Sequence, residues 1–275
     1  MSEFQSMTGR EIQKTPQDVL ALLNAGMALI QEDLYQFNLR GFDLQKANLC
    51  RATLIRADLS QTNLSQADLR GADLRGANLS HAVLRQANLE GACLYRVDLS
   101  GTDLSGANLT DTKLQGARYD SQTCFPEGLA YKSSGAIGPG AHLNGAPLNT
   151  ANLRYADLQG ANLLGAYLGG ADLTGANLRG ARLVQADMRR SILTGAFLRH
   201  ARLNGANLAG VDLRAADLTD AEFERLESIA GADFTLVQGL NEDMRSRLLS
   251  QPAPELETRH PLTLKTTLES LNHSS

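Results

Sequence analysis

Residues 67–81 have the sequence ADLRGADLRGANLSH. Leucine recurs in this stretch at every fifth position, and an alanine precedes each leucine by two positions. The leucine spacing extends outward over residues 34–114 without an exception, and a second run covers residues 143–218 with Met188 as its one departure. The variant Phe223 ends the second run. A repeat of five residues therefore organises most of the chain.

A period of five matches neither ordinary secondary structure. On an α-helix each step of five residues turns the side chain by about 140°, so the leucines would spread around the whole axis. On a flat strand successive leucines would point to opposite faces. The repeated segment is therefore neither a regular helix nor a regular strand.

A square coil accommodates the period. Each five-residue unit makes one short side and a turn, and four units complete a coil in which every leucine points inward. The position two before each leucine also faces inward and must be small, which agrees with Ala67, Thr62 and Ser191 and with the absence of Trp. Successive coils then stack at about 4.8 Å through backbone hydrogen bonds.

The repeat consists of a small residue, then Asp or Asn, then Leu and two further residues, as in 67–71 and 107–111. This pattern resembles the pentapeptide repeat family, in particular its cyanobacterial members, and it covers more than half of the chain. The resemblance implies an all-β solenoid, namely a right-handed quadrilateral β-helix of pentapeptide repeats with helical N- and C-terminal caps. The period alone sets no handedness.

Composition and spacing divide the chain into five parts. Thr15 and Pro16 suit the start of a helix, and the acidic residues of 240–249 suit the start of another. We expect an N-terminal helical cap at 1–33, a first repeat run at 34–118, an inserted loop at 119–141, a second run at 142–224, and a C-terminal helix and polar tail at 225–275. The end of this tail, residues 255–275, is expected to be loosely held.

The interruption between the two runs shifts the repeat. Leu114 and Leu143 are 29 residues apart, which is not a multiple of five, and the intervening residues include aromatic rings and Pro126. One interpretation is a loop inserted at one corner of a continuous rod. The other is a pair of stacked or bent helices of about four coils each.

Nothing in the repeats suggests catalysis. A filled coil leaves no pocket where acid, base or nucleophile groups could converge. The five histidines are scattered, the three cysteines have unrelated spacings, and the many Asp residues suit hydrogen bonding at the corners. We expect a protein that is not an enzyme and has no catalytic, metal-binding or cofactor-binding residues.

The outer surface carries the candidate site. Residues twenty apart stack on successive coils, so stripes of side chains follow from the sequence. Exposed aromatic and Arg residues in one stripe are typical of the centre of a protein interface. The candidate interaction residues are Tyr35, Ile55, Arg56, Arg75, Tyr95 and Arg96 in the first run, and Arg179, Phe197 and Arg199 in the second. The alternative is that these are ordinary tolerated surface residues.

Two functional hypotheses follow. The first is a non-catalytic protein-interaction scaffold with an unidentified protein partner. The second comes from the resemblance, because some family members mimic DNA and modulate type II topoisomerases, which requires an acidic rod. Residues 36–118 hold 10 Lys and Arg against 8 Asp and Glu, and residues 141–220 hold 8 against 6, so the repeats carry +4 and the rest of the chain −8. This distribution disfavours DNA mimicry, and +4 is too diffuse to indicate nucleic-acid binding.

The location follows from what the sequence lacks. There is no apolar run of about 18 residues, so no membrane span is expected. The polar N-terminus has no apolar segment typical of a secretory signal, and three unrelated cysteines fit a reducing compartment. We expect a cytoplasmic protein, and a homodimer formed through an end cap is left open.

Overall fold

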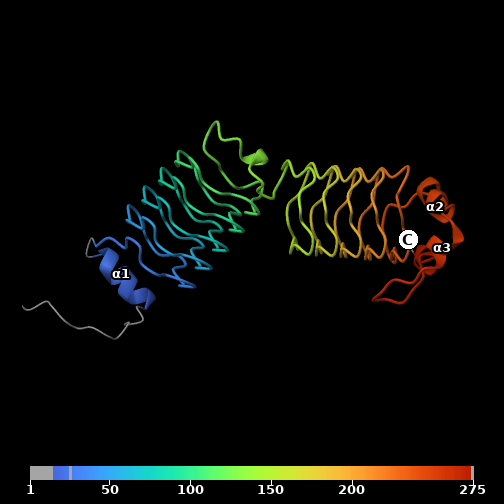
Figure 1. Cartoon of the computed structure of the whole chain (residues 1–275), viewed down its shortest axis with the longest axis horizontal. Helices are drawn as coiled ribbons and strands as arrows, with labels where there is room; N and C mark the ends of the chain where they lie inside the picture. Colours follow the sequence, from blue (N-terminus) through green and yellow to red (C-terminus); the bar gives the residue numbers. More distant parts are fainter. Residues whose placement is uncertain (1–14, 25–26, 274–275) are drawn as a thin grey trace, which may run out of the picture.

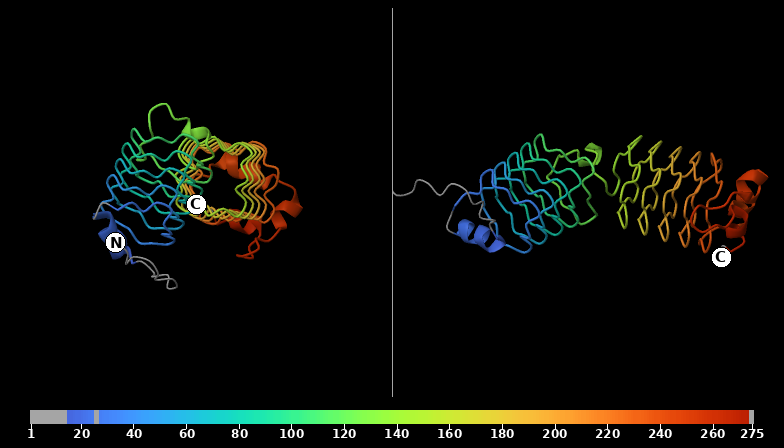
Figure 2. Two further views of the ribbon diagram at one scale, coloured as in Figure 1. Left: turned by 60° about the vertical axis from the view of Figure 1, so that its left-hand side comes forward. Right: turned by 60° about the horizontal axis from the view of Figure 1, so that its bottom comes forward.

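The computed structural model describes residues 15–24 and 27–273, so residues 1–14 and 25–26 of the expected cap lie outside the described residues. The repeats form short sides joined by tight turns. Parallel backbone bridges link each side to the side twenty residues later, as between Asp33 and Thr53. Four repeats therefore make one coil, as predicted. Seen nearly along the second run, the coils superimpose in a four-sided outline (Figure 2).

The interior is filled by the leucines and by the small residues two positions before them. Leu74 and Ala72 are fully buried, and Met188 replaces a leucine without becoming exposed. The polar exceptions Thr62 and Ser191 are buried as well. Each of their hydroxyls donates to the backbone carbonyl three residues earlier, at 2.6 and 2.7 Å, which removes the cost of burying an unpaired polar group. Both inward positions predicted from the sequence are confirmed over most of both runs. At the start of the first run, however, the position two before the leucine holds Phe37 and Phe42, which are large and only partly buried.

Each turn places its second residue in the left-handed backbone region. Gly71 and Gly175 have φ of +62° and +65°, which suits glycine. Arg51 adopts +56° at the equivalent position, so glycine is not obligatory there. Where Asp or Asn precedes the leucine, its side chain supports the turn by accepting from the backbone N–H two residues later, as from Arg70 N to Asp68 Oδ1 at 3.1 Å. The predicted role of these acidic residues at the corners is confirmed.

Residues 119–141 separate two arms whose axes point in different directions (Figure 1). We call residues 29–118 the first arm and residues 142–238 the second arm. The regular register ends at this segment, because Asp103 pairs with Cys124, 21 residues later. The structure therefore agrees with the second interpretation, two helices that meet at a bend, and not with a continuous rod.

The segment 119–141 is packed against the end of the first arm. Tyr119 is only 4% exposed. Its ring makes edge contacts with Phe125 and with Tyr131 of the short helix η1 (Tyr131–Ser133), both at 5.4 Å between ring centroids. Its hydroxyl donates to the carbonyl of Pro139 at 2.9 Å. What the sequence suggested was an inserted loop thus contributes a cluster of three aromatic rings, in which Tyr119 is buried and Phe125 and Tyr131 are partly buried.

Helix α1 (Pro16–Asn24) lies at the free end of the first arm (Figure 1). The Thr15 hydroxyl accepts from the backbone N–H of Asp18 at 3.2 Å, and the Asp18 carboxylate accepts from the N–H of Thr15 at 2.7 Å. These reciprocal bonds satisfy donors at the start of the helix. The helix start predicted at Thr15 and Pro16 is confirmed, and Val19 on this helix is fully buried.

The second arm extends beyond its recognisable repeats. Ser228, Asp233 and Gln238 each pair in parallel with a residue 21 positions earlier, so a further coil follows the last leucine repeat. This coil was not predicted, because one extra residue between Glu222 and Ser228 interrupts the period of five. Three helices come next along the chain: α2 (Glu242–Leu249), α3 (Ala253–Glu257) and α4 (Thr267–Leu271). Figure 1 labels α2 and α3.

The expectation that residues 255–275 are loosely held is wrong over the described part of that segment. His260, Thr267 and Leu271 are buried. The Thr267 hydroxyl donates to the carbonyl of Ile229 at 3.1 Å, and the Ser270 hydroxyl accepts from the backbone N–H of Phe234 at 3.0 Å. These contacts reach back by more than 30 residues, which the polar composition of the segment does not reveal.

We expect Asp212→Asn to lower stability at neutral pH by about 1–2 kcal/mol, because it removes a charged hydrogen bond to the half-exposed Arg214. Asp212 is 2% exposed and accepts from Arg214 Nε at 2.9 Å and Nη2 at 2.8 Å. Burial raises the pKa of Asp212, but Arg214 outweighs burial and leaves this pKa below its ordinary value. The contribution is therefore complete above the unfolded pKa of about 3.9 and is lost as the pH falls through the folded pKa.

Urea titrations at several pH values check this prediction. The difference between wild type and Asp212→Asn should be largest near pH 7 and should shrink towards zero as the pH falls below about 3.9. Asn is a suitable replacement, because it occupies the equivalent position in many repeats and keeps the oxygen that accepts at the turn. A difference that does not depend on pH would contradict the assignment to this ion pair.

Candidate protein-binding surfaces

The first-arm residues predicted from the sequence form one stack at a corner of the coil. Backbone N–H groups of the turn bond to the next coil at each level, from Arg56 to the carbonyl of Arg75 at 3.0 Å and from Gly76 to the carbonyl of Tyr95 at 2.9 Å. Tyr35 is 46% exposed, and Ile55 and Tyr95 are half-buried. We call the stack of Tyr35, Ile55, Arg75 and Tyr95, with Arg56 and Arg96 beside it, the first-arm corner.

The two flanking arginines are held flat on the surface. Arg56 and Arg96 have φ of +56° and +58°. Their side chains lie over Gly76 and Gly116 of the following coil, where an added Cβ would come within 3.6 and 3.4 Å of the arginine Cγ. A glycine twenty residues after a long side chain therefore gives that side chain a flat place to lie. Both guanidinium groups remain exposed at the corner.

Arg75 is less available than its neighbours in the stack. Its Nε and Nη2 donate to the carboxylate of Asp73 at 2.9 and 2.7 Å. These hydrogen bonds hold the pKa of Asp73 below its ordinary value. Arg75 is thus held in an exposed ion pair with Asp73. This ion pair lies between Ile55 and Tyr95 in the stack.

The second-arm candidates contact one another. The guanidinium of Arg179 lies 4.9 Å from the centroid of the Phe197 ring, and Phe197 is 40% exposed. Arg199 lies on the next coil with its Nε 3.9 Å from an oxygen of Asp217. A cation over an aromatic ring contributes about 0.5–1 kcal/mol at an exposed site.

The most exposed aromatic residues of the second arm are not among those predicted from the sequence. Tyr155 is 70% exposed and Tyr167 is 52% exposed. The guanidinium of Arg154 lies 5.6 Å from the centroid of the Tyr155 ring. A usable signal was present in the sequence, because Tyr155 occupies a corner position and Gly175 follows it by twenty residues, which leaves room for a ring.

The nine predicted residues do not form a single cluster, because they lie on two arms. One contact links the two regions: Arg118, at the end of the first arm, donates from Nη2 to the backbone carbonyl of Arg154 at 3.0 Å. Arg118 belongs to the side that directly follows the first-arm corner. The contact therefore connects that side to the corner that carries Tyr155.

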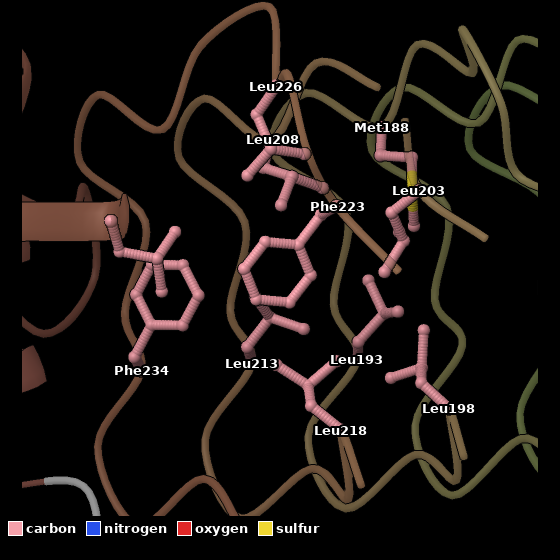
Figure 3. A pocket seen from close by; sticks show the side chains of 11 residues that line it. Met188, Leu193, Leu198, Leu203, Leu208, Leu213, Leu218, Phe223, Leu226 and Phe234 are labelled. Carbon is pink, nitrogen blue, oxygen red and sulfur yellow. The ribbon is translucent and has the colours of Figure 1, made fainter. Parts of the chain in front are cut away.

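The space left inside the second arm is apolar. Figure 3 shows the C-terminal end of the second arm, where Phe223 and Phe234 lie among the leucines and Met188. The space left there is about 10 Å³ and is lined by apolar side chains alone, so it has no partners for a water molecule. Among residues 15–24 and 27–273, no three His, Cys, Asp or Glu side chains gather as a metal site. Within the same ranges no helix is long and apolar enough to cross a membrane.

The coil of four five-residue repeats defines the protein as a pentapeptide-type β-solenoid. The family model for pentapeptide repeats matches in eight copies, over residues 33–71, 62–101, 94–118, 140–170, 151–190 and 196–225. These matches cover more than half of the chain. The chain belongs to the pentapeptide repeat family, whose members fold as right-handed β-helices.

Solved structures of cyanobacterial proteins are similar to this chain. HetL from Nostoc sp. strain PCC 7120, a pentapeptide repeat protein involved in heterocyst differentiation regulation, is 28% identical over 80% of this chain and 96% of its own, with a TM-score of 0.31. The pentapeptide repeat protein alr5209 from Nostoc PCC 7120 is 35% identical over 44% of this chain and 93% of its own, with a TM-score of 0.33. Rfr23 from Cyanothece 51142 is 40% identical over 36% of this chain and 64% of its own, with a TM-score of 0.25. No curated protein matches the chain.

Proposed function

We propose that this protein is a non-catalytic, cytoplasmic interaction scaffold that binds another protein along the outer faces of its two arms. The observation that carries the proposal is the first-arm corner, where Tyr35, Ile55 and Tyr95 lie in register beside two exposed arginines. Aromatic and Arg side chains dominate the binding energy of many protein interfaces. Because the stacked coils fix their spacing, such side chains lose little further entropy on binding.

The helices at the two ends act as caps in this proposal. Val19 of α1 and Leu248 of α2 are buried, with 0% and 1% exposure, in the core formed by the leucines. Solenoids need capping units, because an uncovered terminal coil presents unpaired backbone groups to other chains. Capped ends leave the long sides of the arms as the surfaces for a partner.

The first-arm corner is tested by replacing Ile55, Tyr95 and Arg96 with Ser. We expect partner binding to weaken by about 2 kcal/mol or more, which is roughly thirtyfold in Kd, because two apolar anchors and a charge are removed. The melting curve should change little, since stability comes mainly from the interior and the coil-to-coil hydrogen bonds. Affinity purification from native lysate, followed by titration of the recovered protein, measures both effects.

A control uses a different corner of the first arm, at second turn residues with the backbone conformation of Arg96. Lys46, Gln66 and Gln86 have φ of +60°, +60° and +56°, and replacing these three with Ser should leave partner recovery unchanged. If the corner variant retrieves the same proteins as the wild type, the corner is ordinary surface. A DNA gyrase supercoiling assay is expected to show no effect of the protein, because the arms lack the acidic charge that DNA mimicry requires.

A further inference from the structure

Tyr155 is an exposed aromatic side chain that the fold nevertheless holds in place. Its φ is +54°, and its ring lies over Gly175 of the next coil, where an added Cβ would come within 2.6 Å of two ring carbons. Arg154 lies against the same ring and donates from Nη1 to Asp172 at 2.9 Å. A 70% exposed ring with a fixed orientation is already arranged for contact.

Phe197 lies on the side that begins at the corner of Tyr155. The side contains Asp157, Asn177, Phe197 and Asp217 on successive coils, linked by parallel bridges. Gly175, beneath the Tyr155 ring, is on the coil of Asn177, so Phe197 is one coil further along. Arg179 and Arg199 lie at the far edge of this side. We call Arg154, Tyr155, Arg179, Phe197 and Arg199 the Tyr155 face.

The carboxylates of this side are used internally. Asp157 accepts from Asn177 Nδ2 at 2.9 Å and from the backbone N–H of Gln159 at 3.2 Å. Asp217 accepts from the N–H and the hydroxyl of Thr219 at 3.0 and 2.6 Å. Burial raises the pKa of Asp217, but Thr219 and the two neighbouring arginines outweigh burial and leave the pKa below its ordinary value.

The guanidinium groups keep donors available for a ligand. Asp217 lies near both Arg199 and Arg179, so a single negative charge faces two positive charges. No carboxylate of the described residues comes within 4.0 Å of the Arg179 guanidinium, whose contact is the ring of Phe197. A ring under a guanidinium leaves the N–H edges free, and these edges match the geometry of a carboxylate.

From these contacts we infer that the Tyr155 face binds an acidic segment of a partner protein, with an apolar side chain of that segment against Tyr155 and Phe197 and its carboxylates on Arg179 and Arg199. This inference rests on the proposed scaffold function and names the chemistry of one of its surfaces. The low charge of this arm favours a protein segment over a nucleic acid. Residues 141–220 carry a net charge of only +2, whereas binding a phosphate backbone requires many cations.

A random-peptide library displayed on phage and selected against the full chain tests the inference. We expect selected peptides to combine Asp or Glu with an aromatic or aliphatic residue. A synthetic selected peptide should bind at least about tenfold more tightly than its counterpart with Asn and Gln in place of Asp and Glu, which corresponds to about 1.4 kcal/mol. Arg179→Gln combined with Arg199→Gln should weaken the acidic peptide by a similar factor, and Tyr155→Gly should weaken both peptides.

Arg190→Gln is the matched control. Arg190 is an exposed corner arginine of the same arm, with φ of +58°, on a different edge, and its replacement should leave peptide affinity unchanged. The inference is overturned if acidic residues are not enriched, if Arg190→Gln weakens binding as much as the double variant, or if a single-stranded oligonucleotide displaces the peptide at equal concentration. Should these results occur while the first-arm corner variant still loses its partner, the scaffold function stands and the Tyr155 face alone is rejected.

Discussion

Leu74→Asp is expected to unfold at least several coils of the first arm. Leu74 is fully buried between other leucines, and within residues 15–24 and 27–273 no Lys or Arg is buried that could pair with a carboxylate. Burying an unpaired carboxylate and losing the leucine contacts together cost on the order of 5 kcal/mol or more. Because each coil is stabilised by its neighbours, the damage should spread along the arm.

Leu74→Met controls for the loss of leucine itself. Met188 already occupies an equivalent interior position at 0% exposure, so this variant should cost less than about 1.5 kcal/mol. Far-UV circular dichroism at 25 °C, followed by a thermal melt, distinguishes the two variants. Wild-type spectra and melts for Leu74→Asp would mean that position 74 does not face the interior.

Tyr119→Ala is expected to release the two arms from their fixed arrangement. The ring of Tyr119 is buried against Phe125 and Tyr131, and its hydroxyl bonds to Pro139. Removing a buried aromatic ring costs about 3–5 kcal/mol, and here the loss falls on the segment between the arms. Small-angle scattering should show a wider distribution of overall dimensions, while the circular dichroism of the arms is retained.

Trypsin reports the same change locally. Lys132 is exposed but lies in η1, and its carbonyl accepts from the backbone N–H of His142 at 2.8 Å. Cleavage after Lys132 should be slow in the wild type, slightly faster in Tyr119→Phe, which loses the hydroxyl alone, and much faster in Tyr119→Ala. Equal cleavage of all three proteins would show that the aromatic cluster does not hold the segment.

The arms were predictable because the same requirement, an inward-facing leucine at every fifth residue, recurs many times in the sequence. One leucine at any position is compatible with several folds, whereas leucine at seventeen consecutive fifth positions, in most cases with a small residue two before it, is compatible with few. The same regularity predicted the stacks, so the register of Tyr35, Ile55 and Tyr95 followed from counting by twenty. Handedness did not follow from the period, because mirror-related coils place the same residues inside.

The remaining segments were less predictable because each occurs once. The contacts of Tyr119 with Phe125 and Tyr131, and of Thr267 with Ile229, depend on how a unique chain path returns to the solenoid. Polar composition suggested a loose tail at 255–275, but Ser and Thr hydroxyls bond there to backbone groups of the last coil. A polar composition shows that a segment can lie in solvent. It does not show whether its side chains find hydrogen-bond partners more than 30 residues away.

Site-specific photo-crosslinking in cells tests the central claim, that the arms bind another protein along defined faces. A photoreactive phenylalanine derivative is placed at Tyr95 or Tyr155, and at Gln45 as an exposed corner position outside both surfaces. We predict a crosslinked species of discrete mass from Tyr95, Tyr155 or both, and none from Gln45. No crosslink at either tyrosine, or the same products from all three positions, would contradict the claim.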